Sequence, residues 1–197
     1  MILIHDVKPW MLKIDLPFDT ITFDDALYSQ WYYADHFLAM KKRLIVFVST
    51  GIIHIGDNQV VDISCRDAHK RFFATGDTRP YMTKDQILDL SNRGFEIGLH
   101  GVTHSHMPKG LKGMQMAMDE ALRSYETLKS WGLNPKTMSY PYNEPNTGFK
   151  ILDRYGFEYF GAERITIERF RCDTLSREIT AKKNLMIAKF QMQSKKH

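Results

Sequence analysis

The sequence predicts an α/β fold with a parallel sheet, arranged either as a barrel or as an open doubly wound sheet. Short apolar runs alternate with amphipathic stretches along the 197 residues, which is the pattern of repeated strand–helix units. The clearest run, RLIVFVST at 43–50, is rich in β-branched residues and is followed by Gly51. In both architectures the carboxyl ends of the strands carry the chemistry, so functional residues are expected just after the strands.

The predicted elements follow one another in strand–helix order. Strands are expected at 1–4, 20–23, 43–50, 95–100, 137–142 and 158–163, and helices at about 27–41, 65–74, 83–94, 113–132 and 147–157. The helix at 83–94 has the clearest ends, since Thr83 is a candidate N-cap and Gly94 a stop signal. The segment at 113–132 is the longest helical signal and ends at Gly132.

The composition is that of one soluble globular domain, with 43% hydrophobic and 25% charged residues. The net charge of +4 is mild and the basic residues are spread along the chain, so no nucleic-acid partner is expected. Cys65 and Cys172 form no CxxC pair, which argues against a disulfide scaffold or a Cys-rich zinc site. Without a signal-peptide pattern or a long apolar stretch, the protein is expected in the cytoplasm, with no membrane span and an open oligomeric state.

Most of the predicted strands are followed by side chains that bind metals or transfer protons. These are His5 with Asp6, Asp24 with Asp25, His100 with His104, and the run Tyr140, Pro141, Tyr142 and Asn143. The strand at 43–50 ends instead in Ser49 and Thr50, so the pattern is not a general property of strand ends.

The segment TFDDA at 22–26 places two adjacent carboxylates after a strand. A single Asp in this position is most simply a turn or helix N-cap residue. Two adjacent carboxylates repel each other unless a cation or hydrogen bonds compensate, so a bound metal is the alternative interpretation.

The segment HGVTH places His100 and His104 at i and i+4. On a helical turn this spacing brings both rings to one side, as in other His-x-x-x-His zinc sites. Two histidines and one carboxylate, with an open position for water, form a common catalytic zinc set. Either histidine alone is more simply a partly buried residue with satisfied partners, and His106 is expected to face the other way.

The segment SYPYNEPN at 139–146 is a loop of proline and aromatic residues after a strand. Its simplest interpretation is a turn formed with the help of Pro145. Such a loop can also present a backbone N–H to a developing oxyanion and an aromatic face to a sugar.

Taken together, TFDD, EIGLHGVTH and SYPY resemble, in order and spacing, the motifs of the NodB-homology polysaccharide deacetylases, family four of the carbohydrate esterases. The resemblance covers about residues 1–165. It implies a distorted, incomplete (β/α) barrel of about seven strands. Residues 1–197 are then expected to form a single deacetylase-like catalytic domain with a disordered tail at about 190–197.

The resemblance also implies an activity and a role for each motif residue. The family removes acetyl groups from N-acetylated or O-acetylated sugars and polysaccharides, as a metal-dependent hydrolase of carbon–nitrogen bonds. Asp24 is implied as the general base, while Asp25, His100 and His104 would hold one divalent ion, zinc first, with cobalt or nickel as alternatives. The oxyanion would be held near Tyr142, with Tyr140, Pro141 and Asn143 in the same substrate loop.

The general acid of this family is a histidine in a Leu-His motif on a late strand, and this sequence has no such motif after residue 165. The opening segment ILIHD has that form. A branch of the family that acts on biofilm exopolysaccharides carries its motifs in permuted order, and the first and last strands of a barrel are neighbours. The resemblance to this branch implies His5 as the acid, with Asp6 or another carboxylate to orient it. The alternative is that His5 is a capping residue.

The sequence departs from the family pattern at three positions. Ala26 and Asn143 each stand where the family has glycine, and Asn tolerates similar backbone angles. Ser139 stands where many members have an arginine that orients the base, and Arg169 or Arg171 could replace it in space. Two other functions stay open: hydrolysis of a cyclic amide or ureide on the same scaffold, and non-catalytic carbohydrate binding.

Overall fold

The computed structural model describes residues 1–194, and residues 195–197 lie outside the described part of the chain. The chain divides into two compact units, the first of which is Met1–Arg164, while the second begins at Ile165. All the candidate site residues belong to the first unit. The single catalytic domain expected over 1–197 stays a prediction.

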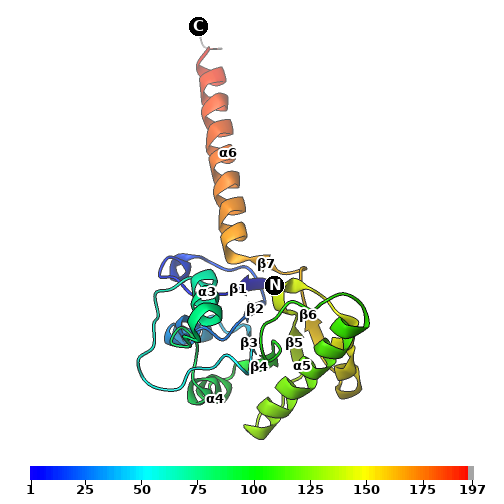
Figure 1. The fold of residues 1–197 in the computed structure, drawn as a ribbon. Coiled ribbons are helices and arrows are strands. Elements are labelled where there is room, and N and C mark those ends of the chain that lie inside the picture. Colours follow the sequence, from blue (N-terminus) through cyan, green and yellow to red (C-terminus); the bar gives the residue numbers. More distant parts are fainter. Residues whose placement is uncertain (195–197) are drawn as a thin grey trace. The chain divides into compact units, whose positions relative to one another are not determined.

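The first unit is built on a curled parallel sheet with the strand order β6-β5-β4-β3-β2-β1 (Figure 1). Its strands are β1 (Ile2–Ile4), β2 (Thr20–Phe23), β3 (Arg43–Val48), β4 (Glu96–Leu99), β5 (Thr137–Ser139) and β6 (Glu158–Phe160). All neighbouring pairs in this order are parallel. With β6 and β1 at opposite ends of the order, the sheet is an incomplete (β/α) barrel, as expected. The short β7 (Ile165–Thr166) begins the second unit and brings the strands of the described residues to seven.

Helices surround this sheet (Figure 1). They are α1 (Tyr28–Tyr32), α2 (Ala34–Leu38), α3 (Cys65–Thr75), α4 (Lys84–Asn92) and α5 (Gly110–Ser130), with the 3₁₀ helices η1 (Met11–Lys13), η2 (Pro141–Asn143) and η3 (Thr147–Tyr155). Thr83 caps α4 as predicted, in a reciprocal capping box with Gln86. Ser64 caps α3 by accepting a hydrogen bond from the backbone N–H of Asp67.

Several elements differ from the sequence-based prediction. The strand expected at 158–163 ends at Phe160. The helix expected at 27–41 is split into α1 and α2, because Tyr33 leaves the helical conformation at φ −104° and ψ 15°. The strand expected at 137–142 ends at Ser139, since Pro141 has no N–H for a sheet ladder. The segment at 147–157 forms the 3₁₀ helix η3, which packs against α5.

The core lies on both faces of the sheet. Residues 44–48 of β3 are all buried, which is why this segment reads as a continuous apolar run in place of an alternating one. Phe23 meets Phe37 of α2 edge to face at 4.9 Å, and Phe47 packs on Phe160 at 5.2 Å. A sheet covered on both faces is a rigid scaffold for the residues at its carboxyl edge.

The second unit consists of β7 and the helix α6 (Ile167–Ser194), for which the sequence analysis made no prediction. The helix includes residues 190–194. Disorder was expected at about 190–197 and stays a prediction, and residues 195–197 lie outside the described part of the chain. None of the described helices is long and apolar enough to cross a membrane.

Candidate active site

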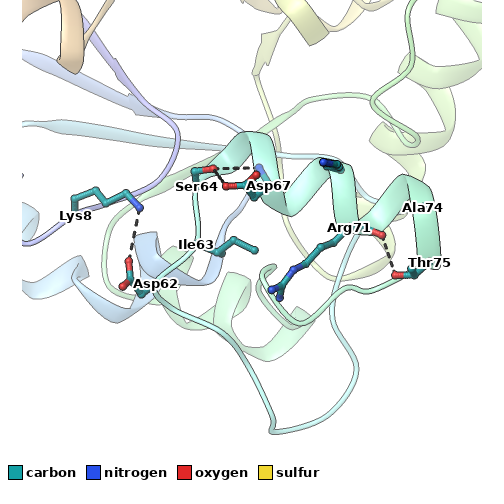
Figure 2. Close-up of a pocket in the computed structure, with 9 residues that line it drawn as sticks. Lys8, Asp62, Ile63, Ser64, Asp67, Arg71, Ala74 and Thr75 are labelled. Carbon is teal, nitrogen blue, oxygen red and sulfur yellow. Dashed lines mark hydrogen bonds and ion pairs between the residues drawn. The ribbon is translucent and has the colours of Figure 1, made fainter.

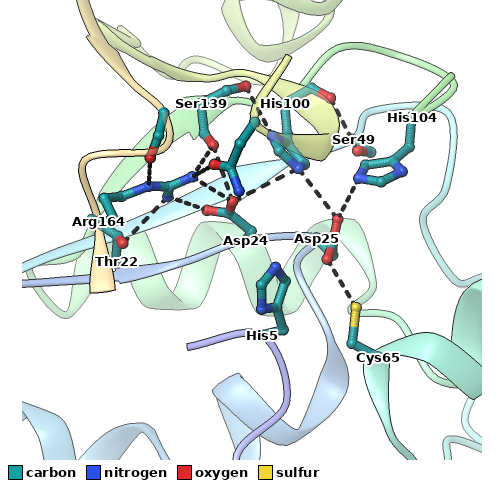
Figure 3. A network of polar contacts seen from close by, with 12 residues as sticks. His5, Thr22, Asp24, Asp25, Ser49, Cys65, His100, His104, Ser139 and Arg164 are labelled. Atoms are coloured by element: carbon teal, nitrogen blue, oxygen red, sulfur yellow. Dashed lines mark hydrogen bonds and ion pairs between the residues drawn. The ribbon is translucent and has the colours of Figure 1, made fainter. Parts of the chain in front are cut away.

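The residues that follow β2 and β4 converge at the carboxyl edge of the sheet (Figure 3). Asp24, Asp25, His100 and His104 are all buried. The Nε2 atoms of His100 and His104 lie 3.3 Å and 3.1 Å from Asp25 Oδ1. The second carboxylate is adjacent, with His100 Nε2 at 3.9 Å from Asp24 Oδ2. Two segments that are 75 residues apart in the chain thus form one cluster of carboxylates and imidazoles.

The histidine pair is held by a loop, and the helical turn expected for HGVTH is not present. Gly101 has φ 77° and His104 has φ 51°, values that no right-handed helix allows. The loop is anchored by Glu120 of α5, whose Oε2 accepts the backbone N–H groups of Val102 at 2.6 Å and Thr103 at 2.9 Å. A side chain on Gly101 would collide with this carboxylate, since a Cβ there would lie 2.8 Å from Glu120 Oε2. The two rings therefore face the same carboxylate without a helical turn between them.

The orientation of His100 is fixed by Ser139 on the neighbouring strand. Its Nδ1 lies 2.9 Å from the carbonyl oxygen of Ser139, which can only accept a hydrogen bond. Nδ1 therefore carries a proton, and Nε2 is the ring atom that faces Asp25. A histidine whose second nitrogen is fixed in this way is typical of a metal ligand.

Asp24 is held by Arg164, which the sequence analysis did not identify. The guanidinium makes two parallel contacts, Nη1 to Oδ1 at 2.7 Å and Nη2 to Oδ2 at 2.8 Å, and its side chain is 0% exposed. Ser139 Oγ donates to Asp24 Oδ2 at 3.0 Å and accepts from Arg164 at 2.7 Å. The sequence suggested Arg169 or Arg171 for this place. Arg164 stands in no recognisable motif, so only its position after β6 reveals it.

The two carboxylates are kept ionised by different neighbours. Burial alone would raise the pKa of Asp24, but the charge and hydrogen bonds of the Arg164 guanidinium outweigh it and hold that pKa below its usual range. Burial acts in the same direction on Asp25, where His104 and His100 hold the pKa well below its usual range. Both groups are therefore expected to be charged at neutral pH.

The residues around Asp25 fit a divalent metal ion. Asp24 has a guanidinium, whereas Asp25 Oδ1 and His104 Nδ1 are buried without a hydrogen-bond partner. A buried charge in this situation is costly unless a cation compensates it. One ligand atom each from Asp25, His100 and His104 lies within 4.8 Å of the others. One carboxylate and two imidazoles are a catalytic zinc set that leaves a position open for water.

His5 follows β1 and its ring points toward the two carboxylates (Figure 3). Its charge contributes to the lowered pKa of Asp24. Gln30 Nε2 fixes the backbone here by donating to the carbonyl oxygens of both His5 and Asp24, each at 2.6 Å. Asp6, the suggested orienting group, instead accepts the backbone N–H of Cys65 at 3.1 Å and pairs with Lys8 at 3.2 Å.

The loop after β5 contributes some of its predicted residues to the site and not others. The Tyr142 ring is 40% exposed and stacks on His106, with centroids 3.6 Å apart and the planes 12° from parallel. Asn143 Oδ1 accepts a hydrogen bond from the guanidinium beside Asp24 at 3.1 Å. Pro141 is buried. The ring of Tyr140 stacks on Tyr159 at 5.7 Å and so belongs to the packing behind the loop.

Backbone strain is concentrated at this site. Among the described residues, the non-glycine positions with positive φ are Lys41 and five site residues, namely Asp25, Ala26, His104, Tyr142 and Asn143. Such a conformation costs roughly 1–2 kcal/mol per residue, and strain of this kind clusters at functional sites. Ala26 and Asn143, which replace glycines of the family pattern, adopt φ 53° and φ 56°, so the glycine-like conformation is kept.

A cavity of about 660 Å³ lies beside this cluster, along α3 (Figure 2). It is lined by Lys8, Asp62, Ile63, Ser64, Asp67, Lys70, Arg71, Ala74 and Thr75. Lys8, one of its lining residues, pairs with Asp6, the residue after His5, at 3.2 Å. None of the clustered carboxylates and histidines lines this cavity.

The fold and the site together define a hydrolase of the α/β class with a candidate metal centre at the carboxyl edge of an incomplete barrel. The family model for polysaccharide deacetylase matches residues 20–160, and the chain belongs to this family of hydrolases, which remove N- or O-acetyl groups from sugars.

Solved structures with the same fold include IcaB from Ammonifex degensii, at 19% identity and a TM-score of 0.56, which covers 84% of this chain and 71% of that chain. A de-N-acetylase from Aggregatibacter actinomycetemcomitans is 14% identical, with a TM-score of 0.54 and coverages of 83% and 76%. The deacetylase PplD of Streptococcus pyogenes, in complex with acetate, is 16% identical, with a TM-score of 0.50 and coverages of 78% and 62%. No curated protein matches the sequence. At these identities the likeness establishes the fold.

Proposed function

We propose that this chain hydrolyses the acetyl group of an N-acetylated or O-acetylated sugar with the aid of one divalent metal ion. The observation that carries the proposal is the different environment of two neighbouring carboxylates. Asp24 is held by a guanidinium, whereas Asp25 faces two imidazoles and lacks a cation. One carboxylate is therefore placed to act as a base and the other to bind a metal.

Asp25, His100 and His104 would hold the ion, zinc first, with cobalt or nickel as alternatives. A divalent ion bound there lowers the pKa of a water molecule and polarises the acetyl carbonyl. The chain itself fixes the orientation of the two histidine ligands. The carbonyl of Ser139 orients His100, and Glu120 holds the loop that carries His104.

Asp24 is proposed as the general base. An ionised carboxylate has about four acceptor directions. Arg164 occupies two of them and Ser139 Oγ a third, which leaves one for the attacking water. Because both oxygens are fixed by buried partners, the free direction is held in one place.

His5 is proposed as the general acid. As the new carbon–oxygen bond forms, Asp24 takes a proton from water. In an N-acetylated substrate the carbon–nitrogen bond then breaks and His5 gives a proton to the leaving amine, so the products are acetate and a free amine. The support for this role is its place at the end of β1, next to β2 in the sheet, with its ring toward the carboxylates.

The loop at η2 is proposed to bind the oxyanion and the sugar. The backbone N–H groups of Asn143 and Glu144 close its turn, while Tyr142, at φ 56°, is proposed to direct its N–H to the oxyanion. The exposed ring of Tyr142 offers an apolar face of the kind that sugars stack on.

Acetate release from oligomers of an N-acetylated sugar tests the proposal. The zinc-loaded protein is expected to release acetate, and Asp24→Asn is expected to lose at least about 10²-fold in kcat while it keeps its metal. The matched control is Asp119→Asn on α5, which removes an exposed carboxylate and should leave kcat unchanged. An unimpaired Asp24→Asn would refute the role of Asp24. Inactivity on acetylated sugars together with hydrolysis of a cyclic ureide would replace the proposal with the cyclic amide alternative.

A further inference from the structure

We propose that Cys65 and His69 of α3 form a second divalent-cation site, which shares Asp25 with the first. This second site goes beyond the proposed deacetylase function. It rests on that proposal only because Asp25 is also a ligand of the first metal site. Such a site would take an ion that accepts a sulfur ligand, such as zinc, cobalt or cadmium, in preference to magnesium or calcium.

The geometry places three different ligand types around one point. Cys65 Sγ lies 3.2 Å from Asp25 Oδ2 and 3.4 Å from His69 Nδ1. His69 Nε2 lies 3.5 Å from Asp25 Oδ1. One ligand atom from each residue falls within 4.8 Å of the others. Thiolate, imidazole and carboxylate are all established zinc ligands.

The two candidate ions would share the carboxylate of Asp25. His100 and His104 approach Oδ1, and the thiol of Cys65 approaches Oδ2, while His69 Nε2 lies 3.5 Å from Oδ1. A carboxylate can bridge two ions in this way, and paired ions in hydrolytic enzymes lie about 3.5–4 Å apart. Asp25, its two histidines, Cys65 and His69 are five side chains in all, which is more than the four ligands that a single tetrahedral ion needs.

The ligands of the second site come from a rigid element. Cys65 and His69 are four residues apart in the first turns of α3, so their side chains lie on the same face of the helix. The start of this helix is fixed by Asp6, which accepts the backbone N–H of Cys65. The ring of His69 is further oriented by stacking on His104, with centroids 4.4 Å apart.

A metal-free network would leave this cluster incompletely satisfied. The thiol of Cys65 can donate to Asp25 Oδ2, yet His69 Nε2 and Asp25 Oδ1 are buried and make no hydrogen bond. Buried polar atoms without partners are rare in folded proteins. An ion between these groups would give both atoms a partner and would join α3 to the end of β2.

Cobalt binding tests this site with a readout other than activity. The protein saturated with Co²⁺ is expected to hold two ions per chain and to show a thiolate-to-cobalt charge-transfer band in the near ultraviolet. Cys65→Ser should lose one ion and the band. The matched control Cys172→Ser changes the other, exposed cysteine and should keep both. His69→Ala, which leaves the thiol in place, should also lose one ion, so the test does not depend on the folding of a single variant.

The outcomes also separate the second site from the first. His100→Ala is expected to lose the first ion and to keep the thiolate band. A wild-type protein that binds one ion without the band would overturn the second site and leave the first one standing. A wild-type protein that binds one ion and shows the band would overturn the proposal of two separate sites. If His100→Ala also retained that single ion, the assignment of the first site to His100 would be wrong as well.

Discussion

At the scale of single residues, Arg164 is the side chain that makes Asp24 different from Asp25. The family pattern has an arginine at the position of Ser139, whereas the arginine that contacts Asp24 here follows β6. The hydroxyl of Ser139 fills the space between guanidinium and carboxylate. Asp24 is thus paired with an arginine that comes from a segment other than the strand of residue 139.

Arg164→Gln is therefore expected to lower kcat by at least about 10²-fold with little change in KM and with the metal retained. The variant should also lose about 3–5 kcal/mol of stability, because a buried carboxylate is left unpaired. Steady-state kinetics, metal analysis and urea unfolding measure the three effects. Arg164→Lys should recover part of kcat, and Arg123→Gln on the surface of α5 serves as the control. A variant with full kcat would contradict the positioning role.

His5 carries the prediction that the permuted motif order makes. His5→Ala is expected to keep the full metal content and to lose about 10²–10⁴-fold in kcat, since a general acid contributes roughly this much. The loss should be smaller for a substrate whose leaving group needs no proton, such as an activated aryl acetate. Equal losses on both substrates, or unchanged turnover on the sugar, would refute the role of His5 as the acid.

At the scale of elements, α5 controls the histidine loop through Glu120. Glu120→Gln replaces a carboxylate that accepts two backbone N–H groups with an amide. Because the loop that carries His104 loses support, metal binding is expected to weaken by about 10–100-fold, the usual effect of losing a group that orients a ligand. Glu126→Gln, on the exposed side of the same helix, is the matched control. Zinc titration against a chromogenic chelator measures both affinities, and equal values for the two variants would contradict the account.

The turn after α3 makes a prediction about acid stability. The hydrogen bond from Arg79 lowers the pKa of Asp77 to about 2, below the value of 3.8 for the free side chain. A lowered carboxyl pKa stabilises the folded state above about pH 4, and the contribution is lost as the pH falls toward 2. Asp77→Asn is expected to lower the urea midpoint slightly at pH 7, with a difference that shrinks below pH 4. A difference that stays constant down to pH 3 would contradict the assignment.

The sequence predicts the strands well, because segments such as RLIVFVST at 43–50 must be apolar on both faces of a parallel sheet. The sequence also predicts that Asp25, His100 and His104 lie close together, since the carboxyl ends of parallel strands meet at one edge of the sheet. It fails where tertiary contacts decide the local structure. The loop at 100–104 takes its shape from Glu120 on a distant helix, and no local pattern shows that contact.

The missed residues left different signals in the sequence. Arg164 left none, because a lone arginine after a short strand has no motif. Glu120 could have been found, since it lies on the buried face of the predicted helix with Ala117 and Ala121. Cys65 and His69 are also visible as an i, i+4 pair of ligand residues in the predicted helix at 65–74.

At the scale of the whole molecule, the first unit places the proposed acid and the proposed base after neighbouring strands. His5 follows β1, the carboxylates follow β2, and the histidine pair follows β4 across the intervening β3. In a parallel sheet these ends share one edge, so a motif order that begins with His5 still assembles a single site. The central claim is therefore that one ion at Asp25, His100 and His104 makes this edge catalytic.

The most direct measurement is the rate of acetate release from an N-acetylated sugar oligomer as zinc is added stepwise to metal-free protein. The account predicts no release without metal, a rate that rises as zinc binds, and no release at any zinc level for His100→Ala. Full activity of the metal-free protein, or undiminished zinc-dependent activity of His100→Ala, would contradict it.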